Sequence, residues 1–311
     1  MKIGLIDVDG HNWPNLALMK ISAYHKSVGD TVEWWWGWEH YDIVYMSKVF
    51  SETYSPDIPD PVNADLVIHG GSGYAIQTID GIEIYDKEKD PPLPECMARM
   101  FPDYSLYPEM TRNHAFGRLT EGCPKKCPWC HVCDMQGTVC HQASELREFW
   151  NGQGCIELMD ANILACPDRE KLLLSLYDSG VKVSFNQGLD IQRMDGDVIP
   201  ILNRMKITTF YFAWDDPKVD LTDQFAKVGD MLRIKDKSRR MVYTMTNFGG
   251  SGADDTLERI YILRSLGFDP YVMIYNKPSA PKILRDIQRW CNNKIIFGAC
   301  PYFEDYKGAT V

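Results

Sequence analysis

Phe116-Gly-Arg-Leu-Thr120-Glu-Gly-Cys123-Pro-Lys-Lys-Cys127-Pro-Trp-Cys130 is the stretch that decides how this chain is interpreted. Its first five residues predict a short strand, and three cysteines follow that strand within one loop. Stable disulfides are rare in reducing compartments, so clustered cysteines indicate metal ligands before they indicate disulfides. An iron–sulfur cube that only transfers electrons takes four protein ligands, whereas three close thiolates leave one iron open. The stretch therefore predicts a metal centre that can bind a further group.

Alternating strand and helix patterns continue from about residue 114 to the C-terminus. The predicted strands lie near residues 116–120, 155–159, 181–186, 207–213, 241–246, 270–275 and 294–298. Repeated βα units predict a parallel sheet or barrel. Six or seven units in this length favour a partial (β/α)6-type barrel over 114–311, with a C-terminal extension. In such folds the chemistry lies at the C-terminal ends of the strands.

The motif Cys123-x3-Cys127-x2-Cys130, with Trp129 before its last cysteine, resembles the radical S-adenosylmethionine (SAM) superfamily. The resemblance implies a [4Fe–4S] cluster on the three cysteines and SAM on the open iron, with adenine near Trp129. It also implies a 5′-deoxyadenosyl radical that abstracts hydrogen from a substrate, and an electron donor such as flavodoxin or ferredoxin. The barrel is thus identified as a radical SAM barrel whose substrate is unassigned.

Polar residues after the next two predicted strands complete the predicted SAM site. Asp160 and Asn162 replace the Gly-Gly-Glu of many radical SAM proteins and resemble the Asp-x-Asn variant of the methylthiotransferase-like and cobalamin-associated groups. A carboxylate and an amide oxygen can accept hydrogen bonds from the SAM ammonium. Asn186, Asp190 and Arg193 are candidates for the ribose hydroxyls and the SAM carboxylate. An ordinary turn at 160–162 and helix capping by Asp190 are the alternatives.

The first 86 residues predict a small Rossmann-like α/β domain, and the proline-rich residues 87–113 predict a linker. Asp9-Gly-His11 resembles the Asp-x-His motif of cobalamin-binding domains, in which the histidine ligates cobalt. Pro14 stands where that motif has its glycine, and the span from Met46 to Asp65 is short for the usual strand and helix. We therefore expect a degenerate domain without cobalamin. A cobalamin-dependent radical SAM methyltransferase is the alternative.

A non-enzymatic module stabilised by zinc is the alternative from another class. Cys133 or Cys140 could add a fourth thiolate to the motif, as structural zinc sites require. Zinc ribbons usually pair two Cys-x2-Cys knuckles, and no second knuckle occurs here. An auxiliary cluster on Cys133 and Cys140 would need Cys155 and Cys166 as well. Structural or incidental thiols are favoured for these residues.

Length and composition restrict the remaining choices. The chain has 311 residues, enough for two domains, and its 45% hydrophobic and 24% charged content is typical of globular proteins. With 33 basic and 43 acidic residues its net charge is −10, which gives no general attraction for nucleic-acid backbones. This balance favours a small-molecule, peptide or nucleotide substrate and leaves nucleic acid open. No apolar run approaches the roughly 20 residues that cross a bilayer, so we expect a cytoplasmic protein without a membrane partner.

Overall fold

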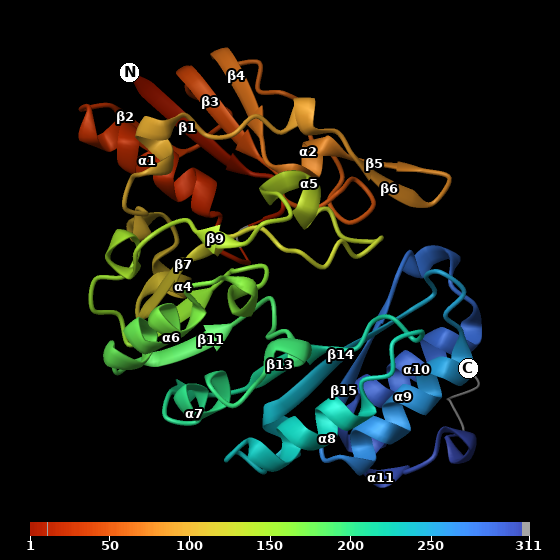
Figure 1. Cartoon of the computed structure of the whole chain (residues 1–311). Coiled ribbons are helices and arrows are strands. Elements are labelled where there is room, and N and C mark those ends of the chain that lie inside the picture. The colour runs from red at the N-terminus through yellow and green to blue at the C-terminus, as the bar shows by residue number, and fades with distance from the viewer. Residues whose placement is uncertain (11, 307–311) are drawn as a thin grey trace. The chain divides into compact units, whose positions relative to one another are not determined.

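Helices alternate with parallel strands along the chain in the computed structural model, which describes residues 1–10 and 12–306 (Figure 1). The predicted α/β class is confirmed at this level. The chain divides into two compact units. The first unit contains Met1–Arg118, Cys130–Thr138 and Ser144–Glu157, and the second contains Leu119–Trp129, Val139–Ala143 and the chain from Leu158 onward.

A four-stranded parallel sheet forms the centre of the first unit, in the order β2-β1-β3-β4. The bounds of these strands are Lys2–Asp7 (β1), Thr31–Trp34 (β2), Tyr41–Ser47 (β3) and Ala64–Gly70 (β4). Helix α1 (Leu16–Ser27) connects β1 to β2 and begins after Asn15, whose side chain accepts a hydrogen bond from the Leu18 N–H. Gly29 follows the helix at φ 86°, a left-handed conformation that glycine adopts at little cost.

Side chains of these strands enter two apolar clusters on opposite faces of the sheet. On one face Ile3 and Leu5 pack with Leu18 and Met19 of α1. The opposite face buries a second set of side chains, Ile6, Tyr41, Val44 and Met46. Segment 87–113, the predicted linker, belongs to the first unit and adds three side chains to the first cluster, those of Met97, Leu106 and Tyr107.

Short elements complete the first unit. They are α2 (Ser72–Ala75), the antiparallel hairpin of β5 (Ile76–Ile79) and β6 (Ile82–Tyr85), α3 (Glu95–Ala98), α4 (Pro108–Thr111), β7 (His114–Gly117), α5 (Val132–Gln136) and β10 (Cys155–Leu158), whose last residue belongs to the second unit. The single strand predicted over 116–120 is therefore divided into β7 and a two-residue strand, β8 (Thr120–Glu121), which pairs with β9 (His141–Gln142) in the second unit.

Parallel strands of the second unit form two separate ladders. β11 (Lys182–Phe185) pairs with β12 (Lys206–Ile207), while β13 (Phe210–Ala213), β14 (Arg240–Thr246) and β15 (Asp269–Ile274) pair in that order. The predicted strand over 207–213 is divided between β12 and β13. Because β12 occupies the edge of β11, the described strands do not close into one continuous barrel sheet.

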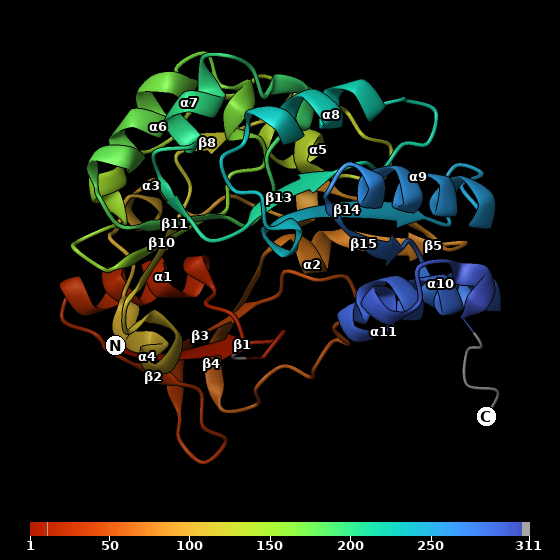
Figure 2. The ribbon, with the colours of Figure 1, turned by 90° about the horizontal axis from the view of Figure 1, so that it is seen from below.

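Helices of the second unit follow these strands in sequence. They are α6 (Arg169–Asp178), α7 (Val198–Leu202), α8 (Thr222–Met231), α9 (Ala253–Ser265), α10 (Lys282–Asn292) and α11 (Lys294–Ala299). Helices α9 and α10 lie beside β14 and β15 and bury Ile260, Ile287 and Trp290 with Val272 (Figure 2).

The strand predicted over 294–298 is wrong, since these residues form α11. The Asn293 side chain accepts hydrogen bonds from the N–H groups of Ile295 and Ile296, which starts a helix at that point. Phe297 then packs edge-on against Trp290, with ring centroids 4.9 Å apart. Among the described residues, no helix is long and apolar enough to cross a membrane.

Candidate functional site

The cysteine loop leaves β8 through Gly122, which has φ 90°. A Cβ atom at this position would overlap the Val139 carbonyl oxygen, so only glycine allows the close approach of the two segments. Cys123, Cys127 and Cys130 are all half-buried. The boundary between the two units falls directly before Cys130.

Asp160 holds the chain that leads into this loop. Its buried carboxylate accepts from the Leu119 N–H at 3.0 and 3.1 Å, and from the N–H and hydroxyl of Thr120 at 2.6 Å each. Hydrogen bonds to a carboxylate are stronger than neutral ones, so Asp160 fixes the start of β8. The contact of Asp160 with the SAM ammonium stays a prediction, beside this positioning role.

Asn162 is a buried residue between a cysteine and a carboxylate. Its side-chain N–H group donates to Asp190 Oδ2 at 3.1 Å and lies 3.7 Å from Cys123 Sγ. Its Oδ1 atom is buried and finds no hydrogen-bond partner within the described residues. A buried acceptor without a donor costs about 1 to 3 kcal/mol, so a ligand that donates here would recover that free energy.

Two cationic side chains contact Asp190 beside the Asn162 amide. Lys125, from within the cysteine motif, approaches Asp190 Oδ1 at 2.8 Å, and Arg193 approaches Oδ2 at 3.4 Å. The Gln192 N–H also donates to Asp190, so the helix-capping alternative is confirmed alongside the polar cluster. Sequence reasoning misses Lys125, because a lysine between two cysteines gives no signal of its partner.

Two other predicted residues have contacts elsewhere. Asn186 is half-buried and its Oδ1 accepts from the Ser184 hydroxyl at 2.7 Å. Trp129 packs edge-on against Phe248, just after β14, with ring centroids 5.3 Å apart. Phe248 in turn contacts Tyr275, which follows β15, at 4.8 Å between centroids. These contacts join the cysteine loop to the ends of two parallel strands.

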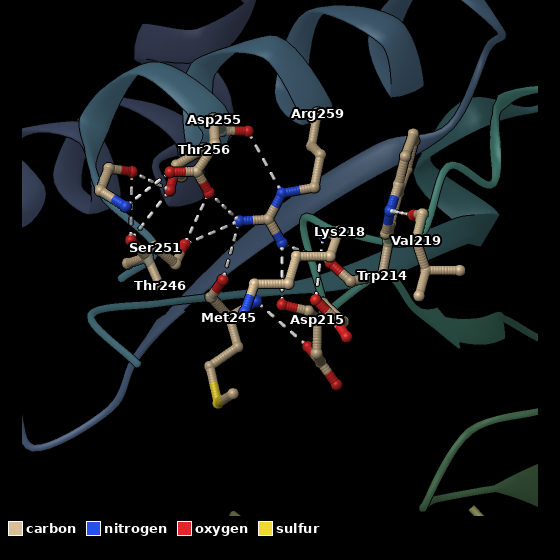
Figure 3. Close-up of polar contacts among 12 residues, drawn as sticks. Trp214, Asp215, Lys218, Val219, Met245, Thr246, Ser251, Asp255, Thr256 and Arg259 are labelled. Carbon is tan, nitrogen blue, oxygen red and sulfur yellow. Dashed lines mark hydrogen bonds and ion pairs between the residues drawn. The ribbon is translucent and has the colours of Figure 1, made fainter. Parts of the chain in front are cut away.

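A second polar cluster surrounds Arg259 on α9 (Figure 3). The buried guanidinium donates to the carbonyl oxygens of Trp214 at 2.7 Å and Met245 at 3.0 Å, and to the Asp255 carboxylate at 2.9 Å. It also donates to the Ser251 hydroxyl at 3.1 Å. Arg259 therefore connects the ends of β13 and β14 to the start of α9.

Asp215 lies at the edge of the Arg259 cluster, and the sequence pattern assigns no role to it. Its Oδ1 accepts from the Met245 N–H at 3.1 Å. Burial raises the pKa of Asp215 to about 6, while the hydrogen bond from Met245 and the charges of Arg259 and Lys125 oppose the rise. This carboxyl group can therefore change its charge near neutral pH.

Cys140 and Cys133 are the two cysteines that a zinc site would add to the motif. Cys140 is buried, donates to the Asn162 carbonyl oxygen at 3.4 Å, and has its pKa raised to about 11 by burial. Cys133 is half-buried on α5. Within the described residues, no three His, Cys, Asp or Glu side chains form a group that could hold a metal ion. Ligation by the three cysteines of the motif stays a prediction.

The predicted cobalt-ligating position, His11, lies outside the described residues. Its neighbour Asp9 accepts hydrogen bonds from the N–H groups of Val49 and Phe50 at 2.6 and 3.3 Å. A Cβ atom at Gly71 would overlap the Lys48 carbonyl oxygen, so this turn packs directly against the chain that follows β3.

Comparison with the models of known protein families gives no match to this chain, and no curated protein matches its sequence.

Proposed function

We propose that this protein is a radical SAM enzyme that acts on a small-molecule, peptide or nucleotide substrate. The observation that carries the proposal is Asn162, whose amide lies between Cys123 and Asp190 and whose Oδ1 has no donor among the described residues. A structural zinc site would not require a buried acceptor beside one of its thiolates. An ammonium-bearing ligand next to the cysteines needs acceptors, and Asn162 Oδ1 can serve as one of them. The parallel strands β11 to β15, with helices between them, support the finer assignment of a partial barrel from residue 114.

The chemistry of the cysteine motif supports the proposed cofactors. Cys123, Cys127 and Cys130 would ligate the [4Fe–4S] cluster, and thiolates are the usual ligands of such clusters. When bound, the cluster with SAM supplies the one-electron cleavage that yields methionine and a 5′-deoxyadenosyl radical. Cys140 would stay outside the ligand set, because its raised pKa favours the protonated thiol at neutral pH.

Different side chains of this chain are proposed to bind different groups of SAM. Asn162 Oδ1 accepts from the ammonium, while Lys125 and Arg193 carry the positive charge that a SAM carboxylate needs. Asp190 holds both cations near the amide, and Asp160 holds the loop that carries the cysteines.

Two further residues are proposed for the rest of the SAM molecule. Trp129, packed on Phe248, offers an apolar ring to adenine. Asn186 remains the candidate for the ribose hydroxyls.

An external reductant such as flavodoxin or ferredoxin is the proposed partner, and the cytoplasm is the proposed location.

We propose that the first unit binds no cobalamin. Two features of this unit support that proposal: the Gly71 turn is packed against the chain at Lys48, and the described residues 48–63 form no helix or strand. The acidic net charge of −10 supports a substrate other than a long duplex.

Anaerobic purification followed by iron analysis, electron paramagnetic resonance and product assay tests the proposal. We expect about four irons per chain and formation of 5′-deoxyadenosine from SAM and dithionite. Cys127→Ala should abolish the product, whereas the exposed Cys96→Ala should not. A colourless protein with stoichiometric zinc, or full turnover by Cys127→Ala, would contradict the proposal.

A further inference from the structure

The outer edge of the sheet in the first unit is formed by β4 (Figure 1). No strand of the described chain pairs with this edge. The strand contains neither lysine nor proline, which are common means of protecting a sheet edge. An edge of this kind can pair with a strand from another chain.

A hydrogen bond at the C-terminal end of the β3–β4 pairing shows which β4 residues direct their backbone groups toward β3. The Lys48 N–H donates to the Gly70 carbonyl oxygen at 3.0 Å, which shows that the Gly70 backbone is directed toward β3. Alternate residues of a strand direct their backbone groups to the same neighbour. Ile68 therefore also faces β3, and the backbone groups of Val67 and His69 point away from the sheet.

The side chains beside these outward backbone groups are accessible. Leu66 and Ile68 lie opposite Ile43 and Tyr45, whose side chains belong to the cluster on the α1 face. The two β4 side chains nevertheless remain 50% and 37% exposed, because they lie at the edge of that cluster. An exposed apolar pair thus flanks the outward backbone groups of Val67.

The sequence of β4, Ala-Asp-Leu-Val-Ile-His-Gly, is complementary to itself in the antiparallel sense. In a pairing centred on Val67, this residue lies opposite its own copy, and Leu66 of each chain lies opposite Ile68 of the other. The same register places Asp65 opposite His69 on the other face of the sheet. An aspartate and a histidine in directly opposed positions can hydrogen-bond across the strands, and they also attract each other when the imidazole is protonated.

We propose that two copies of this chain associate through antiparallel pairing of their β4 strands, with a two-fold axis at Val67. Two reciprocal backbone hydrogen bonds join Val67 of one copy to Val67 of the other, and the neighbouring apolar side chains shield one another. Asp65 and His69 already contact His40 at 3.1 Å and Asp60 at 2.8 Å within one chain. The pairing extends these exposed contacts into a polar network across the interface. A two-fold axis makes the interface self-complementary, as in most homodimers.

Light scattering of the full chain after size exclusion tests the proposal. We expect a mass of about twice 35.7 kDa for the native protein. Val67→Pro removes an outward N–H group, and Ile68→Lys places an ammonium against an apolar partner, so both variants should have the monomer mass. Ile79→Lys is the matched control, because it changes an isoleucine that is 51% exposed on the β5–β6 hairpin, and it should remain dimeric. A native monomer, or a dimer that both β4 variants retain, would overturn the proposal.

A charge exchange tests the register even if Val67→Pro disturbs folding. Asp65→Lys alone places an ammonium opposite the imidazole of His69 and removes its acceptor, and His69→Glu alone places carboxylates opposite each other, so each variant should be monomeric. An equal mixture of the two variants should form a heterodimer, because the introduced lysine then meets the introduced glutamate and the remaining Asp65 meets the remaining His69. Failure of the mixture to associate, when the native chain is a dimer, would exclude this register.

Discussion

The two polar clusters of the second unit both lie where parallel strands end, but they differ in how completely their groups are paired. Every nitrogen of the Arg259 guanidinium donates to a carbonyl, hydroxyl or carboxylate oxygen of the same unit. The Asn162 cluster retains a buried acceptor without a donor among the described residues, and it holds two cations near one carboxylate. Paired polar groups indicate a structural role, whereas a buried unpaired group is an acceptor that a water molecule or a ligand can satisfy.

The largest expected loss of stability comes from replacing Arg259, the central residue of the fully paired cluster. Arg259→Met leaves the carbonyl oxygens of Trp214 and Met245 and the half-buried carboxylate of Asp255 without their shared donor. We expect the free energy of unfolding to fall by about 3 to 5 kcal/mol, measured by urea denaturation. The control Arg204→Met removes an exposed contact with Tyr177 and should change it by at most about 0.5 kcal/mol. Similar losses in both variants would contradict the structural role of Arg259.

A smaller loss is expected from the residue that anchors the cysteine loop. Asp160→Ala leaves the N–H groups of Leu119 and Thr120 unpaired, so the free energy of unfolding should fall by about 1 to 3 kcal/mol. Iron retention should fall as well, since the loop loses its fixed start. Asp168→Ala is the control, because this exposed aspartate does not cap α6 with its side chain. Unchanged stability and iron content would show that Asp160 does not position the loop.

The pH dependence of stability tests whether Asp215, at the edge of the Arg259 cluster, has a raised pKa. Its pKa is raised from 3.8 to about 6 in the folded protein, so the folded state binds more protons than the unfolded state between these values. Stability should therefore decrease as the pH rises from about 4 to about 6, by roughly 1 to 2 kcal/mol. Asp215→Asn should remove this part of the dependence. An unchanged pH profile in the variant would contradict the raised pKa.

Sequence periodicity predicts those elements whose patterns are local. The strands predicted near residues 181–186, 241–246 and 270–275 follow from local apolar runs, and the structure confirms them as β11, β14 and β15. Residues 294–298 have strand-like composition, but the Asn293 cap makes them helical. The pattern over 207–213 predicts a single strand, because it does not reveal that β12 pairs with β11 while β13 pairs with β14.

Residues of the candidate site can be predicted from the sequence where the residue type and its spacing indicate a ligand or a polar contact. The three cysteines, Asn162 and Asp190 follow from spacing and from their position after strands. The roles of Lys125 and Arg259 cannot be predicted from the sequence, because their partners are distant in sequence. Only folding brings each residue to its partner. Asp160 is predictable for its carboxylate, but its contacts with the start of β8 cannot be anticipated from the motif.

Calorimetric titration of SAM into the anaerobically reconstituted protein tests the central claim most directly. The native chain should bind one SAM, and Asn162→Leu should bind it about tenfold more weakly, which corresponds to about 1.4 kcal/mol. Its stability should change by less than about 1 kcal/mol, because the unpaired oxygen is removed with the amide. The exposed Asn151→Leu serves as the matched control and should bind like the native chain. Absence of SAM binding to the native protein, or equal affinity in Asn162→Leu, would contradict the account.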